Sequence, residues 1–288
     1  MSEIENIAKE MIAKGKGILA ADESTGTMTK RLASVKVEST SENRLKFRET
    51  LFSAEGMKNY IGGVILYDET IKQKTLSGKT IPELIKSFGS IPGIKVDTGA
   101  KKLAGSSEEK VTEGLDGLRE RLSEYYKLGA RFTKWRAVYN ISQTHPTELA
   151  VKSNAHALAR YAALVQEAKM VPIVEPEVLM DGDHNINKCY EVTGKVLKEC
   201  YKELRLHNVN LRGTILKPNM ILPGNKSKDK SDTAEIAKMT LKCLKENVPS
   251  EVPGIAFLSG GQTEIEATQN LNEINKINDT NFLMSFSY

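Results

Sequence analysis

The chain has 288 residues, a length that fits one large domain or two domains of ordinary size. Hydrophobic residues make up 40% and charged residues 27% of it, which is typical of a globular protein and excludes a disordered chain. The net charge of +4 is too small to indicate nucleic acid or membrane binding, and no apolar run reaches the ~18 residues of a membrane span. The modest positive excess suits an anionic small molecule.

The first sixteen residues show helical spacing of apolar side chains and lack the apolar core and cleavage site of a secretion signal. Three widely spaced cysteines, an odd number, favour free thiols in a reducing compartment. They are Cys189, Cys200 and Cys243. Four histidines, alone or with the cysteines, form no familiar zinc spacing. They are His145, His156, His184 and His207. We therefore expect a cytoplasmic protein without a metal or cofactor.

Short β-rich apolar runs alternate with longer stretches of helical periodicity along the whole chain. The expected strands lie near 17–22, 61–67, 93–97, 130–136, 171–177, 213–217, 254–259 and 281–288. One of the helices between them is predicted to begin at Asp232, with Glu235 in the third helical position. No internal linker, fixed repeat or low-complexity tract is visible, so residues 1–288 are expected to form a single domain with a helical extension at 1–16.

Eight strands alternating with helices predict a parallel sheet, and eight is the number that closes a (β/α)₈ TIM barrel. An open, doubly wound sheet is the alternative, although no Gly-x-Gly-x-x-Gly joins a first strand to a helix. Residues 98–114 and 218–231 are expected to be loops that take part in function. The lysines of the second, Lys226, Lys228 and Lys230, fit either a solvated surface or a mobile basic flap.

Charged residues occur near the carboxyl ends of five expected strands, where side chains two positions apart share a face. They are Asp22, Lys95 with Asp97, Lys134 with Arg136, Glu175 with Glu177, and Lys217. One such charge can be a structural ion pair. Five strands with charge at the same end predict an active site, because barrel enzymes build theirs at the carboxyl ends of the strands.

The residue types indicate the chemistry. A lysine is nucleophilic only as a neutral amine, and desolvation and neighbouring cations both favour that form. Lys217, which follows an apolar segment and would share the barrel mouth with Lys95 and Lys134, is suited to form a Schiff base with a ketone. The resulting iminium accepts electrons when an adjacent C–C bond breaks. Glu175 and Glu177 could divide the proton transfers that such a reaction needs.

Two segments could hold anions. The seventh expected strand ends in Ser259-Gly260-Gly261, and adjacent glycines let backbone N–H groups converge on a phosphate. The turn Glu23 to Thr27, followed by Arg31, offers a second anion site. An ordinary turn explains either segment taken alone. Two phosphate sites beside a Schiff-base lysine indicate a bisphosphorylated sugar.

Five motifs together resemble class I fructose-bisphosphate aldolase, in that family's order and over residues 8–288. They are Leu19-Ala-Ala-Asp-Glu-Ser-Thr-Gly26, Lys134-Trp-Arg136, Val174-Glu-Pro-Glu-Val178, Leu216-Lys-Pro-Asn-Met220 and Phe257-Leu-Ser-Gly-Gly-Gln262. The resemblance implies a homotetramer of barrels, without a metal, that cleaves fructose 1,6-bisphosphate to dihydroxyacetone phosphate and glyceraldehyde 3-phosphate. The choice of this sugar rests on the resemblance.

The resemblance also implies a role for each matching residue. Lys217 matches the Schiff-base lysine, Glu175 the acid/base of imine formation, and Glu177 its companion. Lys134 matches the lysine that supports carbinolamine chemistry, and Asp22 the aspartate that handles the C4 hydroxyl proton. On the 6-phosphate and substrate side lie Ser24, Thr27, Arg31 and Lys95, with Arg136 as a second cation near the site. On the 1-phosphate side lie Ser259, Gly260, Gly261 and Ser287.

The sequence departs from the family pattern in two places. Thr27 stands where many members have serine, which keeps the hydroxyl. In the family, the strand ending at Tyr288 continues with Gly-Arg, a last barrel helix and a tail, so a barrel lacking that helix and tail is expected. The outer face of the last strand would then lack cover. That face is either Phe282 with Met284 or Leu283 with Phe286.

Two alternatives to an active aldolase follow from the sequence. One is a catalytically impaired, truncated aldolase that serves only as a binding or interaction scaffold. The other is a different lysine-dependent phosphosugar aldolase, such as a transaldolase-like enzyme, although the paired phosphate motifs argue against it. A zinc-dependent aldolase is a third alternative and the least favoured by the sequence.

Overall fold

The computed structural model describes residues 2–106 and 108–288 and has eight parallel strands in one sheet. In spatial order these are β1 (Gly17–Ala21), β2 (Ile61–Leu66), β3 (Ile91–Lys95), β6 (Phe132–Tyr139), β7 (Val171–Val178), β8 (Ile215–Leu216), β9 (Gly254–Phe257) and β10 (Leu283–Phe286). A parallel bridge between Ile18 and Ser287 joins the last strand to the first and closes the barrel. The prediction of a (β/α)₈ barrel is therefore confirmed, and the open-sheet alternative is wrong.

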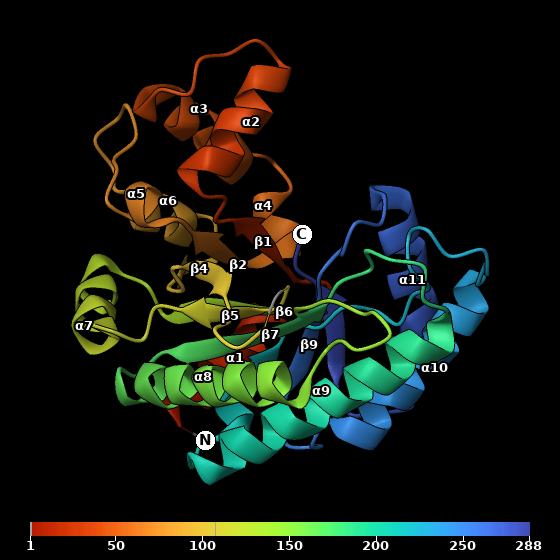
Figure 1. Cartoon of the computed structure of the whole chain (residues 1–288). Helices are drawn as coiled ribbons and strands as arrows, with labels where there is room; N and C mark the ends of the chain where they lie inside the picture. Colours follow the sequence, from red (N-terminus) through yellow and green to blue (C-terminus); the bar gives the residue numbers. More distant parts are fainter. Residues whose placement is uncertain (1, 107) are drawn as a thin grey trace.

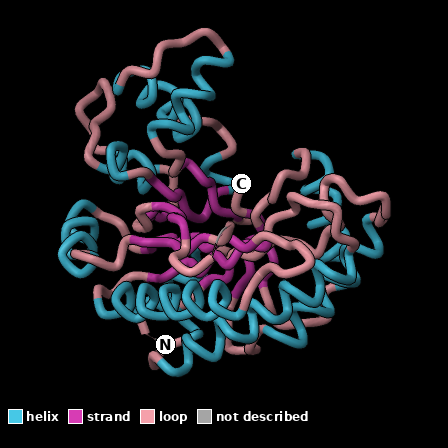
Figure 2. The backbone as a smooth tube through the Cα atoms, in the orientation of Figure 1, coloured by secondary structure: helices cyan, strands magenta, loops and turns pink. Residues whose placement is uncertain are grey.

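The helices surround the sheet, which occupies the centre of the molecule (Figure 2). They are α1 (Glu3–Met11), α2 (Thr25–Ser34), α3 (Ser41–Phe52), α4 (Met57–Tyr60), α5 (Asp68–Ile71), α6 (Ile81–Ser87), α7 (Leu118–Leu128), α8 (Glu148–Glu167), α9 (Ile186–Leu206), the 3₁₀ turn η1 (Leu211–Gly213), α10 (Thr233–Asn247) and α11 (Glu264–Ile277). Helices α2 and α3 project above the barrel, whereas α8, α9 and α10 cover its flank (Figure 1).

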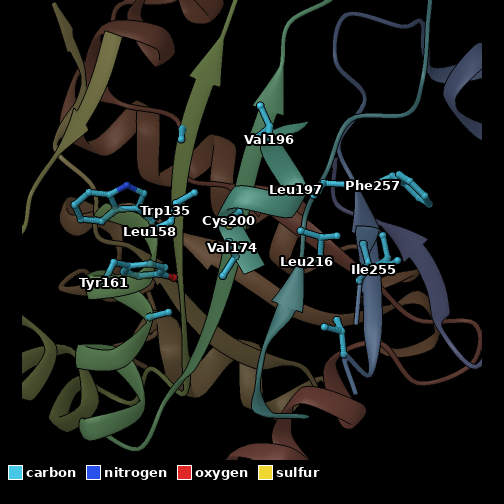
Figure 3. Close-up of a cluster of buried hydrophobic side chains, with 14 of the residues drawn as sticks. Trp135, Leu158, Tyr161, Val174, Val196, Leu197, Cys200, Leu216, Ile255 and Phe257 are labelled. Carbon is cyan, nitrogen blue, oxygen red and sulfur yellow. The ribbon is translucent and has the colours of Figure 1, made fainter. Parts of the chain in front are cut away.

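Two apolar layers hold the barrel together. The inner layer fills the barrel with side chains such as Ile18, Phe132, Ile173 and Ile215. Helix α1 adds Ala8, Met11 and Ile12 to this layer, so the extension expected at 1–16 packs against the barrel interior. The outer layer lies between strands and helices. There Trp135 of β6 contacts Tyr161 of α8, with ring centroids 5.3 Å apart, beside Leu158 (Figure 3).

Each of the eight expected strands overlaps a strand of the sheet, and the expected bounds differ from the observed ones by at most three residues. Asp232 accepts a hydrogen bond from the backbone N–H of Glu235 at 2.8 Å and begins α10, as predicted. Residues 218–231 contain no helix or strand, which confirms that loop. Residues 98–114 differ, because they include an antiparallel hairpin of β4 (Gly99–Lys102) and β5 (Lys110–Glu113). The strand near 213–217 is shorter than expected and ends before Lys217.

The outer face of β10 is less bare than the sequence predicted. Phe282 and Met284 are buried in the outer apolar layer, so the expectation of missing cover is wrong for this pair. Leu283, of the alternative pair, is 40% exposed. The burial of Met284 follows from the position of β10, which pairs with β9 along its whole length and lies beside α11.

Candidate active site

A cleft of about 1210 Å³ opens at the carboxyl ends of the barrel strands. Side chains along each strand alternate between the barrel interior and its outside. The side chains that point to the interior therefore continue, at the carboxyl end of the strand, into the cleft. On β6 this row passes from Phe132 to Lys134, on β7 from Ile173 to Glu175, and after β8 from Ile215 to Lys217. The apolar residue of each pair belongs to the inner layer, and the charged one lies two positions further on.

The structure brings the predicted site residues together. Those that line the cleft are Asp22, Ser24, Thr27, Arg31, Lys95, Lys134, Arg136, Glu177, Lys217, Ser259, Gly260, Gly261 and Ser287. Glu175 is the exception, because it lies just behind the lining and is 3% exposed. It reaches the site through its ion pairs with two of the lining lysines.

Four buried charges form a continuous chain at the centre of the cleft. Lys217 Nζ lies 3.2 Å from Glu175 Oε1, and Lys134 Nζ lies 3.3 Å from Glu175 Oε2. Lys134 Nζ also lies 2.8 Å from Asp22 Oδ2. Two lysines and two carboxylates thus alternate in a region where each side chain is at most 11% exposed. Each buried charge has a partner of opposite sign, which offsets the cost of removing it from water.

This arrangement fixes the protonation of two of its members. Burial by itself would raise the pKa of Asp22, but the charges of Lys134 and Lys217 outweigh it and lower the pKa below its usual value. Burial by itself would lower the pKa of Lys134, but Asp22 and Glu175 raise it above the usual lysine value. Asp22 is therefore a carboxylate and Lys134 an ammonium at neutral pH.

A second set of charges lies along the neighbouring strands. Lys95 Nζ pairs with Asp97 Oδ1 at 2.9 Å, and Asp97 accepts the backbone N–H of Arg136 at 3.2 Å. The Arg136 guanidinium pairs with Glu177. Burial opposes the charge of Arg136, but the hydrogen bond to Glu177 raises its pKa. Lys95 and Arg136 thus keep positive charge in the cleft, each held in place by a buried carboxylate.

Two loops provide backbone and hydroxyl groups suited to anions. Gly260 and Gly261 have φ angles of +62° and +89°, the left-handed region that glycine adopts without strain. Such a backbone can turn successive N–H groups toward one anion. Near them, the buried hydroxyl of Ser287 has no hydrogen-bond partner among the residues that the structure describes. These features favour the prediction of a phosphate site formed by Ser259, Gly260, Gly261 and Ser287.

The other loop lies between β1 and α2. Ser24 caps α2 and accepts the backbone N–H of Thr27 at 3.3 Å, so the positive end of the helix dipole faces this part of the cleft. Arg31, in the last turn of α2, pairs with Glu23 at 2.6 Å. The buried Arg48 of α3 lies 3.7 Å from the other oxygen of Glu23 and donates to its backbone carbonyl. Arg48 thereby fixes the loop that carries Asp22 and Ser24.

Arg121 is a lining residue that the sequence did not place in the site. It lines the cleft and donates to the backbone carbonyl of Val96 at 2.8 Å. Asp97 also lines the cleft, as one of the charges expected at the strand ends. Arg121 belongs to α7, where alternating charges are typical of a solvated helix face, so no local pattern distinguishes it. Among the residues that the structure describes, no histidine or cysteine, the types that zinc prefers, lines the cleft.

The fold and this lysine–carboxylate cluster define an aldolase-type lyase built on a barrel. The model of the family "Fructose-bisphosphate aldolase class-I" matches residues 3–288. The chain belongs to the class I fructose-bisphosphate aldolase family, a lyase family, as the resemblance predicted.

Individual relatives agree with this assignment. A probable fructose-bisphosphate aldolase class 1 of Xanthomonas campestris is 51% identical over all of this chain and 86% of its own length. The cytosolic fructose-bisphosphate aldolase 4 of Arabidopsis thaliana is 53% identical over 95% of this chain and 70% of its own. A Plasmodium falciparum aldolase, solved in complex with TRAP and an inhibitor, is 46% identical with a TM-score of 0.98, over 99% of this chain and 83% of its own.

Proposed function

We propose that Lys217 forms a Schiff base with the ketone of fructose 1,6-bisphosphate and that the chain of charges around it performs the proton transfers. The observation that carries this proposal is the position of Glu175, which lies within 3.3 Å of the amines of both Lys217 and Lys134. A carboxylate in that place can accept a proton from one amine while the other retains its charge. The mechanism is the one that the family resemblance implies for these residues.

The proposed reaction begins with the addition of Lys217 to the sugar and ends with hydrolysis of the iminium. Lys217 gives a proton to Glu175, and the resulting neutral amine adds to C2 of the sugar. Glu175 then returns this proton, with which the carbinolamine oxygen leaves as water. Asp22, held as a carboxylate by Lys134, takes the proton of the C4 hydroxyl. The C3–C4 bond then breaks, its electron pair moves into the iminium to give an enamine, and glyceraldehyde 3-phosphate leaves. The enamine takes up one proton at C3, which balances the proton that Asp22 removed from the C4 hydroxyl. One water then hydrolyses the iminium, which releases dihydroxyacetone phosphate and regenerates Lys217.

The two anion sites are proposed to hold the two ends of the open-chain sugar. Ser259, Gly260, Gly261 and Ser287 would bind the 1-phosphate. The α2 side, with Ser24, Thr27, Arg31 and Lys95, would bind the 6-phosphate, and Arg136 would add positive charge between them. Glu177, which pairs with Arg136, would orient that cation.

Borohydride trapping tests the role of Lys217. Reduction in the presence of dihydroxyacetone phosphate is expected to fix one adduct per chain on Lys217, located by mass spectrometry of the digested protein. The variant Lys217→Met should give no adduct, whereas Lys226→Met, in the 218–231 loop, should behave as the wild type. An adduct that persists in Lys217→Met would contradict the proposal, as would cleavage activity that a chelator abolishes.

The same trapping separates the two alternatives. A catalytically impaired scaffold would give a folded protein with neither an adduct nor turnover. A different phosphosugar aldolase would form the adduct but prefer monophosphorylated sugars in a substrate panel.

The assembly and location are also proposals. Family resemblance supports a homotetramer, which light scattering of the purified protein would test. The Arabidopsis and spinach relatives bear the names cytosolic and cytoplasmic, and on that basis we propose the cytoplasm for this chain. None of the helices in the described parts of the chain combines the length and apolar character that a membrane span requires.

A further inference from the structure

Two histidines and a glutamate meet on the outer surface of the barrel, away from the cleft. His156 lies in the middle of α8, while Glu203 and His207 come from the end of α9. In Figure 1 these two long helices lie side by side along the flank of the molecule. The carboxyl end of α9 leads to the amino end of β8, whereas Lys217 follows the carboxyl end of β8. The cluster therefore lies toward the opposite end of the barrel from Lys217.

The ligand-type atoms of the three residues converge. His156 Nδ1 lies 3.0 Å from Glu203 Oε2, and His207 Nδ1 lies 3.7 Å from the same oxygen. One such atom from each residue lies within 4.8 Å of the others. Ligand atoms of a tetrahedral zinc ion, bound at about 2.0–2.2 Å, are about 3.3 Å apart. The half-exposed His156 can make the small adjustment that closes the set around an ion.

The tautomer of His207 decides which of its ring nitrogens can bind an ion. Its Nδ1 lies 2.9 Å from the backbone carbonyl oxygen of Glu203 as well as 3.7 Å from the Glu203 carboxylate. In the neutral tautomer protonated on Nε2, Nδ1 keeps its lone pair and can bind the ion that Glu203 and His156 share. The two imidazole rings meet edge to face, with centroids 5.0 Å apart and an interplanar angle of 69°, so both histidines lie in direct contact.

The positively charged side chains near the cluster pair with carboxylates other than Glu203, so the histidines are the partners of Glu203. Lys202 and Arg205, its neighbours on α9, pair with Glu199 at 3.0 Å and with Glu251 at 3.5 Å. Lys152 of α8 pairs with Glu148 at 2.6 Å. Lys152, Lys202 and Arg205 thus each pair with a carboxylate other than Glu203. The side chain of Glu203 is only 14% exposed, which restricts its motion and makes it a preorganised ligand.

We propose that His156, Glu203 and His207 form a binding site for one divalent cation that favours imidazole, such as Zn²⁺, with water completing its coordination. Two neutral imidazoles and one carboxylate are a donor set that zinc accepts readily. The bound ion links α8 to α9 and stabilises the folded chain, because it binds the folded state and not the separated helices. It takes no part in aldol cleavage, which occurs at the other end of the barrel.

The sequence did not indicate this site because its ligands come from two helices. Glu203 and His207 are four residues apart on one helix face, a common spacing without a metal. Only the packing of α8 against α9 brings His156 to them. The sequence-based expectation of a metal-free protein considered only spacing along the chain, and this proposal departs from it.

Calorimetric titration of the full-length protein with ZnCl₂ tests the proposal. The wild type is expected to bind one ion per chain, with a thermal midpoint that rises on addition of zinc and returns with EDTA. His156→Asn and Glu203→Gln are each expected to weaken binding by at least about tenfold, since loss of an outer-shell partner alone costs that much. Matched controls are His145→Asn, a histidine outside the cluster, and Glu199→Gln, one turn earlier on α9. Both should bind as the wild type does.

Two results would overturn the proposal. One is a wild type that binds no zinc, in which case the cluster is only an ion pair. The other is unchanged binding in His156→Asn and Glu203→Gln, which would place the ion elsewhere. Anomalous scattering at the zinc edge from crystals soaked in ZnCl₂ decides the position without a variant, because a peak between α8 and α9 supports the site and a peak only at another place refutes it. Aldolase activity of both variants is expected to equal that of the wild type.

Discussion

Glu175 joins the two lysines on which the proposed chemistry depends. Its two carboxylate oxygens contact the amines of Lys217 and Lys134 separately, and its burial removes competing water. A neutral amide in its place would keep the volume and lose both the charge and the ability to exchange protons. The loss therefore affects the proton transfers directly and removes one of the charges that raise the pKa of Lys134.

The variant Glu175→Gln is expected to lower kcat by about 10²–10⁴-fold, the usual contribution of a positioned acid or base. Steady-state cleavage of fructose 1,6-bisphosphate measures the effect, and a melt by circular dichroism checks that the fold persists. Glu191→Gln, at an exposed position on α9, is the matched control and should leave kcat unchanged. A loss of less than tenfold in Glu175→Gln would remove this residue from the proton transfers.

Asp22 gives a prediction about pH. Its pKa is lowered in the folded chain, so it stabilises the protein fully above the ordinary aspartate pKa of about 3.9, and that contribution is lost as the pH falls through the folded value. At pH 7, Asp22→Asn is expected to reduce the free energy of unfolding by about 1.5–3 kcal/mol, typical of a hydrogen bond to a charged partner. The difference from wild type should shrink below about pH 4.

Urea unfolding of both proteins between pH 7 and pH 3 measures this difference. Asp279→Asn removes an exposed aspartate that pairs with Lys245 and should change the stability little at any pH. A difference for Asp22→Asn that stays constant across the pH range would show that the stabilisation does not come from its charge.

At this scale the sequence predicted which side chains gather in the cleft, because charges at strand ends repeat with the strand period. Lys134, Glu175 and Lys217 each follow an inward-facing apolar residue by two positions, a pattern visible without a structure. Arg121 could not be predicted in this way. Its place in the cleft depends on hydrogen bonds to the carbonyls of Gly114 and of Val96, and Val96 lies 25 residues earlier in the chain.

At the scale of elements, the hairpin β4–β5 is the main feature that the sequence did not predict. Its strands carry lysines and glutamates, and glycine and serine lie between them, a composition typical of a loop. The hairpin packs against α8, and a buried side chain of that helix binds its backbone. Asn154 is fully buried, accepts the backbone N–H of Thr112 at 3.1 Å and donates to the carbonyl of Lys110 at 2.8 Å. Such a contact between segments leaves no periodic pattern in either one.

The variant Asn154→Ala would leave these two backbone groups of β5 without partners. We expect a loss of about 1–3 kcal/mol in the free energy of unfolding, the cost of buried unsatisfied polar groups. Hydrogen exchange at the amide of Thr112 should quicken more than exchange in the barrel strands. Ser153→Ala, at the adjacent position of α8, should affect neither measurement. Equal acceleration throughout the barrel would instead indicate that Asn154 supports the whole fold.

At the scale of the whole molecule, closure of the barrel depends on the meeting of its first and last strands. The Ala20 backbone N–H donates to the carbonyl of Tyr288 at 2.7 Å, and Ile18 bridges Ser287. The ring of Phe286 packs over Gly17, where an added Cβ atom would lie 2.4 Å from the ring carbons. The absence of a side chain at Gly17 is therefore what allows β10 to approach β1 and to place Ser287 in the cleft.

The variant Gly17→Ala is expected to destabilise the protein by about 1–3 kcal/mol, the usual cost of overpacking, because the Phe286 ring must move away from β1. The same shift would displace Ser287, so the KM for fructose 1,6-bisphosphate should rise together with the loss of stability. Gly26→Ala is the matched control, since a Cβ atom there meets nothing within 4 Å and alanine favours the α2 helix. Thermal unfolding and steady-state kinetics measure both effects. A stable Gly17→Ala variant with an unchanged KM would show that closure tolerates the added methyl group and that Phe286 can repack without moving the site.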